Sequence, residues 1–300
     1  LKNAKRKINI VEHLRMVRMA WLAKACGGKE ELNNVILNYS GEWARQVLNN
    51  DDVPVYLDSD TINEKLFEHA LNTFIGAAPK TMTPSTRSEI HIANGTPDLF
   101  LDLFDTTHDR IYLNATERIL DPVFSQLETP YAHPLGDLIW RTYQSGGFEN
   151  LSSLIKPIEE KIQPYLDLDH ISLTFTKSHN WKHTEYHNTV GMRKDMGKIT
   201  LLNEDDHKEI ILPSPSTFGL LYRFMDDDAY LKLGLELAHA VLKEVLLLYP
   251  DGRNHGCSAR GVHSYVIGHG GNWGAGYVST ILRAALNKDV YGIQLPNIDL

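Results

Sequence analysis

The chain has 300 residues, of which 42% are hydrophobic and 23% charged, and its formal net charge at pH 7 is −8. This composition is that of an ordinary globular protein with enough chain for a large core. It argues against nucleic acid as the main partner, because binding to phosphate groups normally needs a cluster of Lys and Arg side chains.

Cysteine content and hydropathy bear on the compartment. The chain has only two Cys residues, so no disulfide framework is indicated and we expect a reducing, cytoplasmic environment. No apolar run approaches the ~20 residues that a helix needs to span a bilayer, and no signal peptide is visible. We therefore expect no membrane partner.

The first half of the chain alternates helical patterns with short strand-like patterns. The helical patterns show apolar residues at intervals of three and four, as at Leu32, Ile36 and Trp43. The strand-like patterns alternate polar and apolar residues. We predict helices at 8–26, 32–47, 61–74, from Pro97 onward, 117–127, 135–144 and 149–163, and strands at 89–92 and 110–113.

After Pro164 the pattern changes to strands. Residues 171–176 and 198–202 alternate apolar and polar side chains, and 208–212 follows a polar turn, so we expect an antiparallel hairpin. The predicted elements that follow are a long helix over 227–249 and a strand, a glycine-rich turn and a helix within 262–286.

These elements together predict an α/β fold of the α+β type. We expect a helical N-terminal part, a mixed and mainly antiparallel sheet in the C-terminal half, and the strand–turn–helix unit near the C-terminus. No interdomain linker stands out, so we predict one domain over residues 1–300. The alternative is a division into a helix-rich part, 1–165, and a part with the sheet and the long helix, 166–300.

The glycine-rich turn is the most informative stretch for function. Glycine lets the backbone approach a ligand closely, and free N–H groups at a helix start favour an anion. We expect His269 to act on a substrate there and the turn to bind it. The alternative is a tight turn that lets a helix pack close to a sheet. The residues expected to bind the substrate in this turn are Gly268, Gly270, Gly271, Asn272 and Trp273.

A second cluster is His183-Thr-Glu185-Tyr-His187. On a strand, residues two apart lie on one face, so two imidazoles and one carboxylate would point the same way. Such a set binds zinc or iron and leaves positions open for a substrate. The alternatives are a metal-free site in which Glu185 acts as a catalytic acid or base, and a solvent-facing hairpin edge.

Three residues between 254 and 263 are further candidates. Cys257 is a candidate nucleophile if a neighbouring group lowers the pKa of its thiol, and His263 is a further candidate catalytic residue. Arg260 is expected to pair with an anionic group of the substrate. Arg87, in the predicted strand region with Glu89 and His91, is a candidate for binding a carboxylate or a simple surface ion pair.

The sequence therefore favours an enzyme that transforms a small molecule by an oxidative or hydrolytic reaction at a histidine-rich, metal-dependent site. One alternative is a metal-free lyase or a condensing or cyclising enzyme. Another is a non-catalytic ligand-binding or assembly protein, and a homo-oligomer fits either class. The enzyme hypothesis requires that the segments around Glu185 and His269 meet at one cavity.

Overall fold

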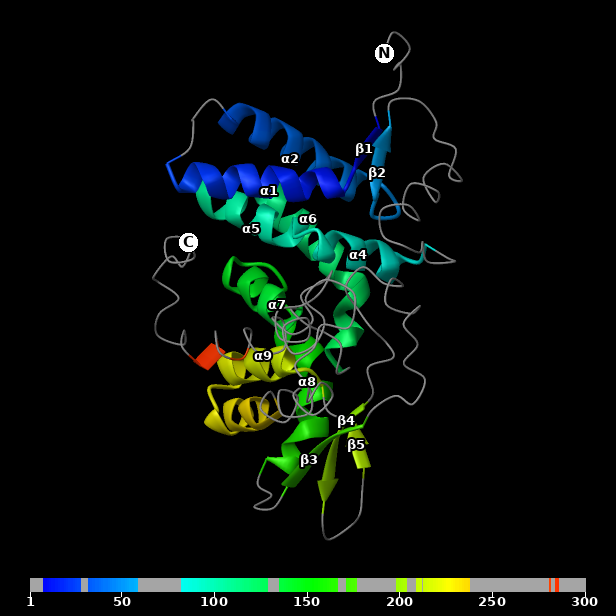
Figure 1. Cartoon of the computed structure of the whole chain (residues 1–300), viewed down its shortest axis with the longest axis vertical. Helices are drawn as coiled ribbons and strands as arrows, with labels where there is room; N and C mark the ends of the chain where they lie inside the picture. The colour runs from blue at the N-terminus through cyan, green and yellow to red at the C-terminus, as the bar shows by residue number, and fades with distance from the viewer. Residues whose placement is uncertain are drawn as a thin grey trace, which may run out of the picture.

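A computed structural model describes most of the N-terminal two thirds of the chain and little of the C-terminal third (Figure 1). The described part is mainly helical, and its strands form two small separate sheets. The predicted α/β fold is therefore wrong. The described residues are 8–27, 32–58, 82–128, 135–166, 171–176, 198–203, 209–211, 213–237, 281 and 284–285.

The helices have well-defined bounds, and residues 228–237 form a further helical stretch. Several agree with the sequence prediction, in particular the helix predicted over 135–144. The α-helices are α1 (Glu12–Ala25), α2 (Leu32–Asn49), α4 (Pro84–Ala93), α5 (Thr96–Thr107), α6 (Arg110–Leu120), α7 (Leu135–Gln144), α8 (Leu151–Ile162) and α9 (Pro215–Met225), and the 3-10 helices are η1 (Asp121–Glu128) and η2 (Gln163–Tyr165).

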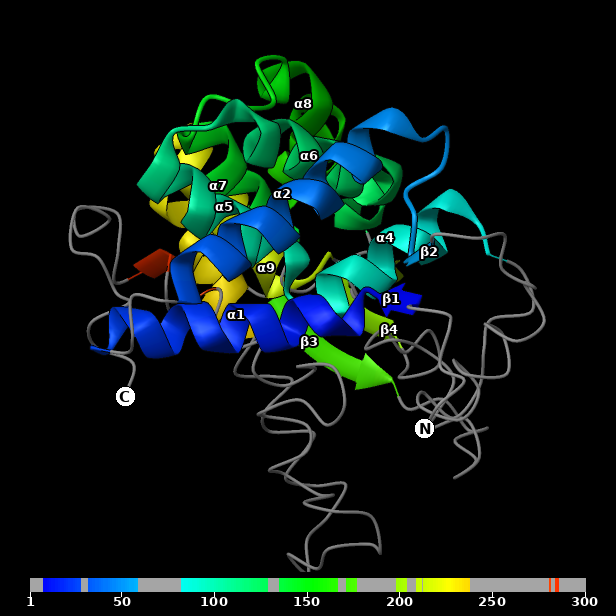
Figure 2. The ribbon, with the colours of Figure 1, turned by 90° about the horizontal axis from the view of Figure 1, so that it is seen from above.

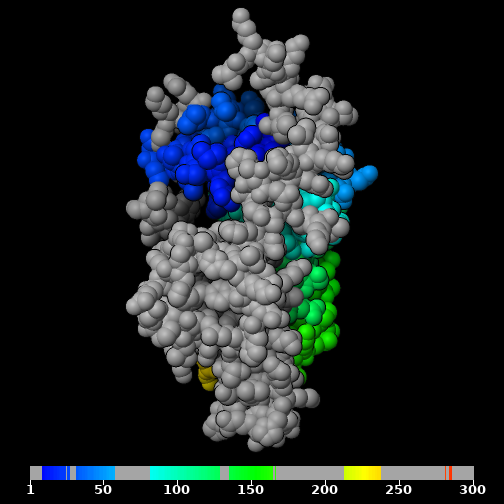
Figure 3. Space-filling model, turned by 45° about the vertical axis from the view of Figure 1, so that its right-hand side comes forward, coloured from blue at the N-terminus to red at the C-terminus, as the bar shows by residue number. Residues whose placement is uncertain are grey.

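The helices are stacked along the long axis of the molecule (Figure 1). Helices α1 and α2 contact each other and lie on α5 and α6, which in turn contact α7, and α7 packs against α9. The view from above shows α1 and α2 side by side (Figure 2). In the space-filling view, the blue N-terminal segment that includes these two helices is exposed on the upper part of the visible face (Figure 3).

The strands pair only locally. Strands β1 (Ile8–Ile10) and β2 (Tyr56–Asp58) form an antiparallel ribbon beside α1 and α2. Strands β3 (Ile171–Thr176), β4 (Lys198–Asn203) and β5 (Glu209–Ile211) form an antiparallel sheet in that order. The strands expected near 171, 198 and 208 are thus present, but they make a small antiparallel sheet and no mixed sheet is described.

The predicted strand at 89–92 is wrong, because these residues lie in α4. The helix starts at Pro84, which suits a first helical position, and the Thr83 hydroxyl caps it by accepting a hydrogen bond from the Thr86 N–H at 3.1 Å. Residues 88 to 92 are all buried, so the alternation of polar and apolar types in 89–92 does not mark one buried face and one exposed face.

The predicted strand at 110–113 is also wrong, because it is the first turn of α6. The Asp109 side chain caps the helix by accepting a hydrogen bond from the Ile111 N–H at 3.1 Å. The buried residues follow the helical repeat of three and four, which places one continuous face against α2 and α5. They are Tyr112, Leu113, Ala115, Thr116, Ile119 and Leu120.

Helices α7 and α9 are in very close contact. A Cβ atom added at Gly136 of α7 would lie 2.1 Å from the Ser216 carbonyl oxygen of α9, and the Gly136 N–H donates to the Ser216 hydroxyl at 2.9 Å. Only a residue without a side chain fits here. The sequence pattern predicts no element over residues 215–225, so α9 is an addition to the predicted fold.

Packing of these helices forms one continuous hydrophobic core among the described residues. Its largest fully buried side chains include Trp43 from α2, Phe100 from α5 and Phe218 from α9. Among the described residues, none of the helices has both the length and the apolar character needed to cross a membrane.

Candidate functional site

Most of the residues singled out from the sequence lie outside the described part of the chain. This holds for the proposed metal ligands, for the glycine-rich turn and for the cluster that precedes it. The joint cavity expected between them is likewise not described. The residues concerned are His183, Glu185, His187, Cys257, Arg260, His263, Gly268, His269, Gly270, Gly271, Asn272 and Trp273.

Arg87 is the one predicted site residue that the structure describes. It lies on α4, not on a strand, and its guanidinium Nε is 4.0 Å from a carboxylate oxygen of Asp52. Glu89 is buried and accepts hydrogen bonds from the Gln126 amide at 2.7 Å and from the Ser85 hydroxyl at 3.4 Å. Arg87, Glu89 and His91 therefore lie on a helix and do not line one face of a strand.

His91 is completely buried in α4 and contacts Trp43 edge-on, with 6.0 Å between the ring centroids. Its Nε2 lies 2.8 Å from the Pro54 carbonyl oxygen, which accepts only, so Nε2 carries the proton and donates. Burial lowers the pKa of His91 to about 4, although the bond to Pro54 opposes the shift. His91 is thus a neutral imidazole that holds the segment before β2 against α4.

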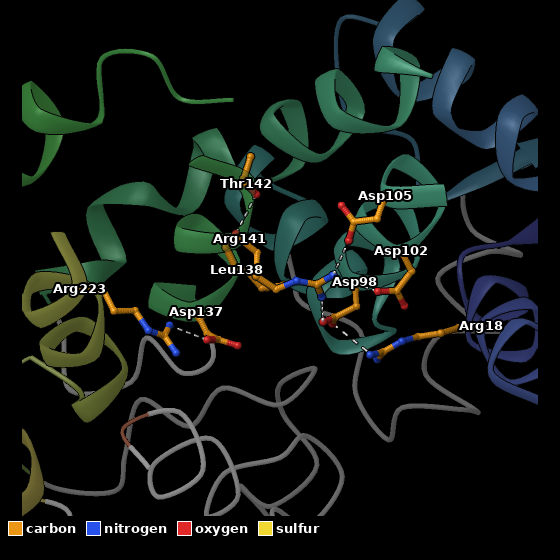
Figure 4. A network of polar contacts seen from close by, with 9 residues as sticks. All are labelled: Arg18, Asp98, Asp102, Asp105, Asp137, Leu138, Arg141, Thr142 and Arg223. Carbon is orange, nitrogen blue, oxygen red and sulfur yellow. Dashed lines mark hydrogen bonds and ion pairs between the residues drawn. The ribbon is translucent and has the colours of Figure 1, made fainter. Parts of the chain in front are cut away.

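The largest polar constellation in the described structure is a network of aspartates and arginines (Figure 4). Asp98, Asp102 and Asp105 follow one another along α5 at intervals of four and three residues, which places them on one face of the helix. Arg141 of α7 reaches all three carboxylates, at 3.4, 2.9 and 3.6 Å.

Arg18 extends the network to α1. Its guanidinium is 3.5 Å from the carboxylate of Asp98, and it also lies against Gly95, where an added Cβ would be 2.7 Å from a guanidinium nitrogen. Gly95 has φ +69°, a conformation that glycine adopts without strain. One row of carboxylates therefore links α1, α5 and α7 through two arginines.

Burial and charge act in opposite directions on this network. Burial raises the pKa of the Asp102 carboxyl, and Asp98 adds to that shift, while Arg141 and Arg18 oppose it. The pKa of Arg141 is raised because the attraction of Asp102, Asp98 and Asp137 outweighs the burial of its guanidinium. Arg141 therefore stays charged, and Asp102 holds a proton more readily than an exposed carboxyl.

A separate buried pair joins α7 to α9. Arg223 donates to the Asp137 carboxylate at 2.8 Å, and the two side chains are 2% and 5% exposed. Asp137 precedes Arg141 by four residues, so α7 carries one acidic and one basic side chain on the same side. In Figure 4, Arg223 and Arg18 lie on opposite sides of the network of aspartates around Arg141.

This arrangement is well suited to fixing α1, α5 and α7 to one another. A perturbed pKa marks functional sites, but structural ion-pair networks perturb pKa values in the same way. Within the described ranges, His, Cys, Asp and Glu side chains form no group of three or more that could hold a metal ion.

The network was not predicted from the sequence, although the sequence contains part of the pattern that indicates it. The spacing of Asp98, Asp102 and Asp105 gives one acidic edge as soon as the segment is recognised as a helix. The partner Arg141 lies 36 residues beyond Asp105, and nothing in the sequence pairs it with that edge.

Comparisons with known proteins place the chain in no family. No protein-family model, no curated protein and no solved structure matches it.

Proposed function

We propose that the protein is an enzyme that transforms a small molecule at a histidine-rich site. The observation that carries the proposal is the clustering of imidazole groups in two stretches of the sequence, 183–187 and 255–269, the second of which runs into a glycine-rich turn. Imidazole is the side chain best suited to acid–base chemistry and to metal binding near neutral pH.

Several buried polar groups in the described part of the chain make contacts between structural elements. Asp102 and Arg141 bind each other between α5 and α7, and His91 donates to the Pro54 carbonyl. Groups that already hold helices or loops together are poorly placed to bind a substrate as well. The reactive groups are therefore better sought in the histidine-rich stretches.

Two versions of the chemistry follow from the residues. In the first, His183, Glu185 and His187 bind iron or zinc and leave positions for the substrate in an oxidative or hydrolytic reaction. In the second, the same groups act as acid and base without a metal, in an elimination or a condensation. In both, His269 and the amides of the glycine-rich turn stabilise charge on the substrate.

Metal analysis of protein purified without a histidine tag separates the two versions. The first predicts iron or zinc near one equivalent per chain, lost in the His183→Ala and His187→Ala variants and retained in His108→Asn. His108 is a suitable control because it is exposed and ends α5 with φ 56°, a conformation that asparagine tolerates. Absence of metal from the wild-type protein rejects the first version.

Anion binding tests the glycine-rich turn in either version. Thermal unfolding is followed with inorganic phosphate and with citrate, for the wild type and for His269→Ala and Arg260→Ala. Binding of an anion to the folded state raises the midpoint temperature of unfolding. At an anion concentration of one hundred times the Kd, the free energy of unfolding rises by about 2.7 kcal/mol. If neither anion stabilises the wild type and no metal is found, the proposal gives way to a non-catalytic binding or assembly role.

The remaining partner assignments belong to the same proposal. The substrate is a small molecule with an anionic group, and neither nucleic acid nor a membrane is involved. A homo-oligomer in the cytoplasm fits the composition, and light scattering on purified protein measures the oligomeric state directly.

A further inference from the structure

We draw no further inference here: the strongest candidate, the exposed apolar side chains of Met16, Met19 and Leu22 along α1, carries nothing because nothing in the structure shows what covers this face.

Discussion

Arg223 of α9 donates a hydrogen bond to Asp137 of α7 at 2.8 Å, and both side chains are almost fully buried. The pair lies next to the close contact of Gly136 with Ser216, so charge and shape fix the same two helices. A buried ion pair contributes little net free energy compared with apolar residues of equal size, yet losing one partner leaves a buried charge unpaired.

Replacement of one partner should therefore be costly. We expect Arg223→Met to lower the free energy of unfolding by about 3–5 kcal/mol, and Asp137→Asn to be destabilising as well. Denaturant unfolding monitored by circular dichroism measures both. The double variant Asp137→Asn/Arg223→Met should be more stable than Arg223→Met, and a loss in the double variant equal to the sum of the two single losses would contradict the coupling.

Glycine substitutions test the contact of α7 and α9 by shape alone. Gly136→Ala places a methyl group 2.1 Å from the Ser216 carbonyl oxygen, a position that only a shift of backbone can relieve. We expect a loss of about 1–3 kcal/mol or more in the free energy of unfolding.

Gly41→Ala is the matched control. Gly41 lies inside α2, and an added Cβ there makes an ordinary contact at 3.5 Å with the Tyr112 hydroxyl. Alanine favours helix over glycine, so this variant should gain about 0.5–1 kcal/mol. Equal effects of the two substitutions would show that the helices are not in the close contact described here.

Arg141 forms ion pairs with the carboxylates of Asp98, Asp102 and Asp105. Its removal should leave the repulsion among these three carboxylates uncompensated. We expect Arg141→Gln to cost about 2–4 kcal/mol near neutral pH, as for the loss of a partner from a mostly buried pair. Arg141→Lys should restore only part of this, since one ammonium cannot match the fork of a guanidinium. Urea unfolding of each variant gives the values.

The control for Arg141 is Arg45→Gln. Arg45 pairs with Glu42 at 3.1 Å on the surface of α2, where both side chains are about half exposed. Such pairs are worth little, so the variant should stay within about 0.5 kcal/mol of the wild type. The deficit of Arg141→Gln should also shrink as the pH is lowered, because burial raises the pKa of Asp102 and its protonation removes part of the repulsion. A deficit that is constant with pH would refute the electrostatic explanation.

The helical repeat of α6 is present in the sequence, but it can be recognised only over a stretch longer than four residues. Residues 110–113 alone look like a strand, whereas the buried positions from Tyr112 to Leu120 follow the helical repeat without a break. A similar short alternation misled the assignment of 89–92, where Thr83 and Pro84 mark a helix start. Four residues are too few to distinguish a period of 2 from one of 3.6.

Contacts between residues that are far apart in the chain could not be predicted from the sequence. The helix over 135–144 was predicted with its observed bounds, yet nothing in it reveals that Arg141 meets Asp102 or that Asp137 meets Arg223. The strands near 171 and 198 were predicted too, but whether strands join a central sheet depends on partners far along the chain. This is why the predicted elements were combined into the wrong fold class.

His91 should make the fold sensitive to acid, and its environment fixes the sign. The pKa of His91 is about 4 in the folded protein and near 6.5 when the chain is unfolded, so between these values the unfolded state binds more protons. Stability is then fully present above pH 6.5 and falls as the pH drops toward 4. The loss from this one group is at most about 3.4 kcal/mol, from 1.36 kcal/mol per pKa unit.

His91→Gln is the variant that tests this, because the glutamine amide can still donate to the Pro54 carbonyl but does not titrate. We expect its free energy of unfolding to fall less steeply than that of the wild type between pH 6.5 and 4, as measured by urea unfolding at several pH values. The exposed His108, changed to Asn, should leave the wild-type slope intact. If the slope survives in His91→Gln, the buried neutral imidazole is not the source of acid sensitivity.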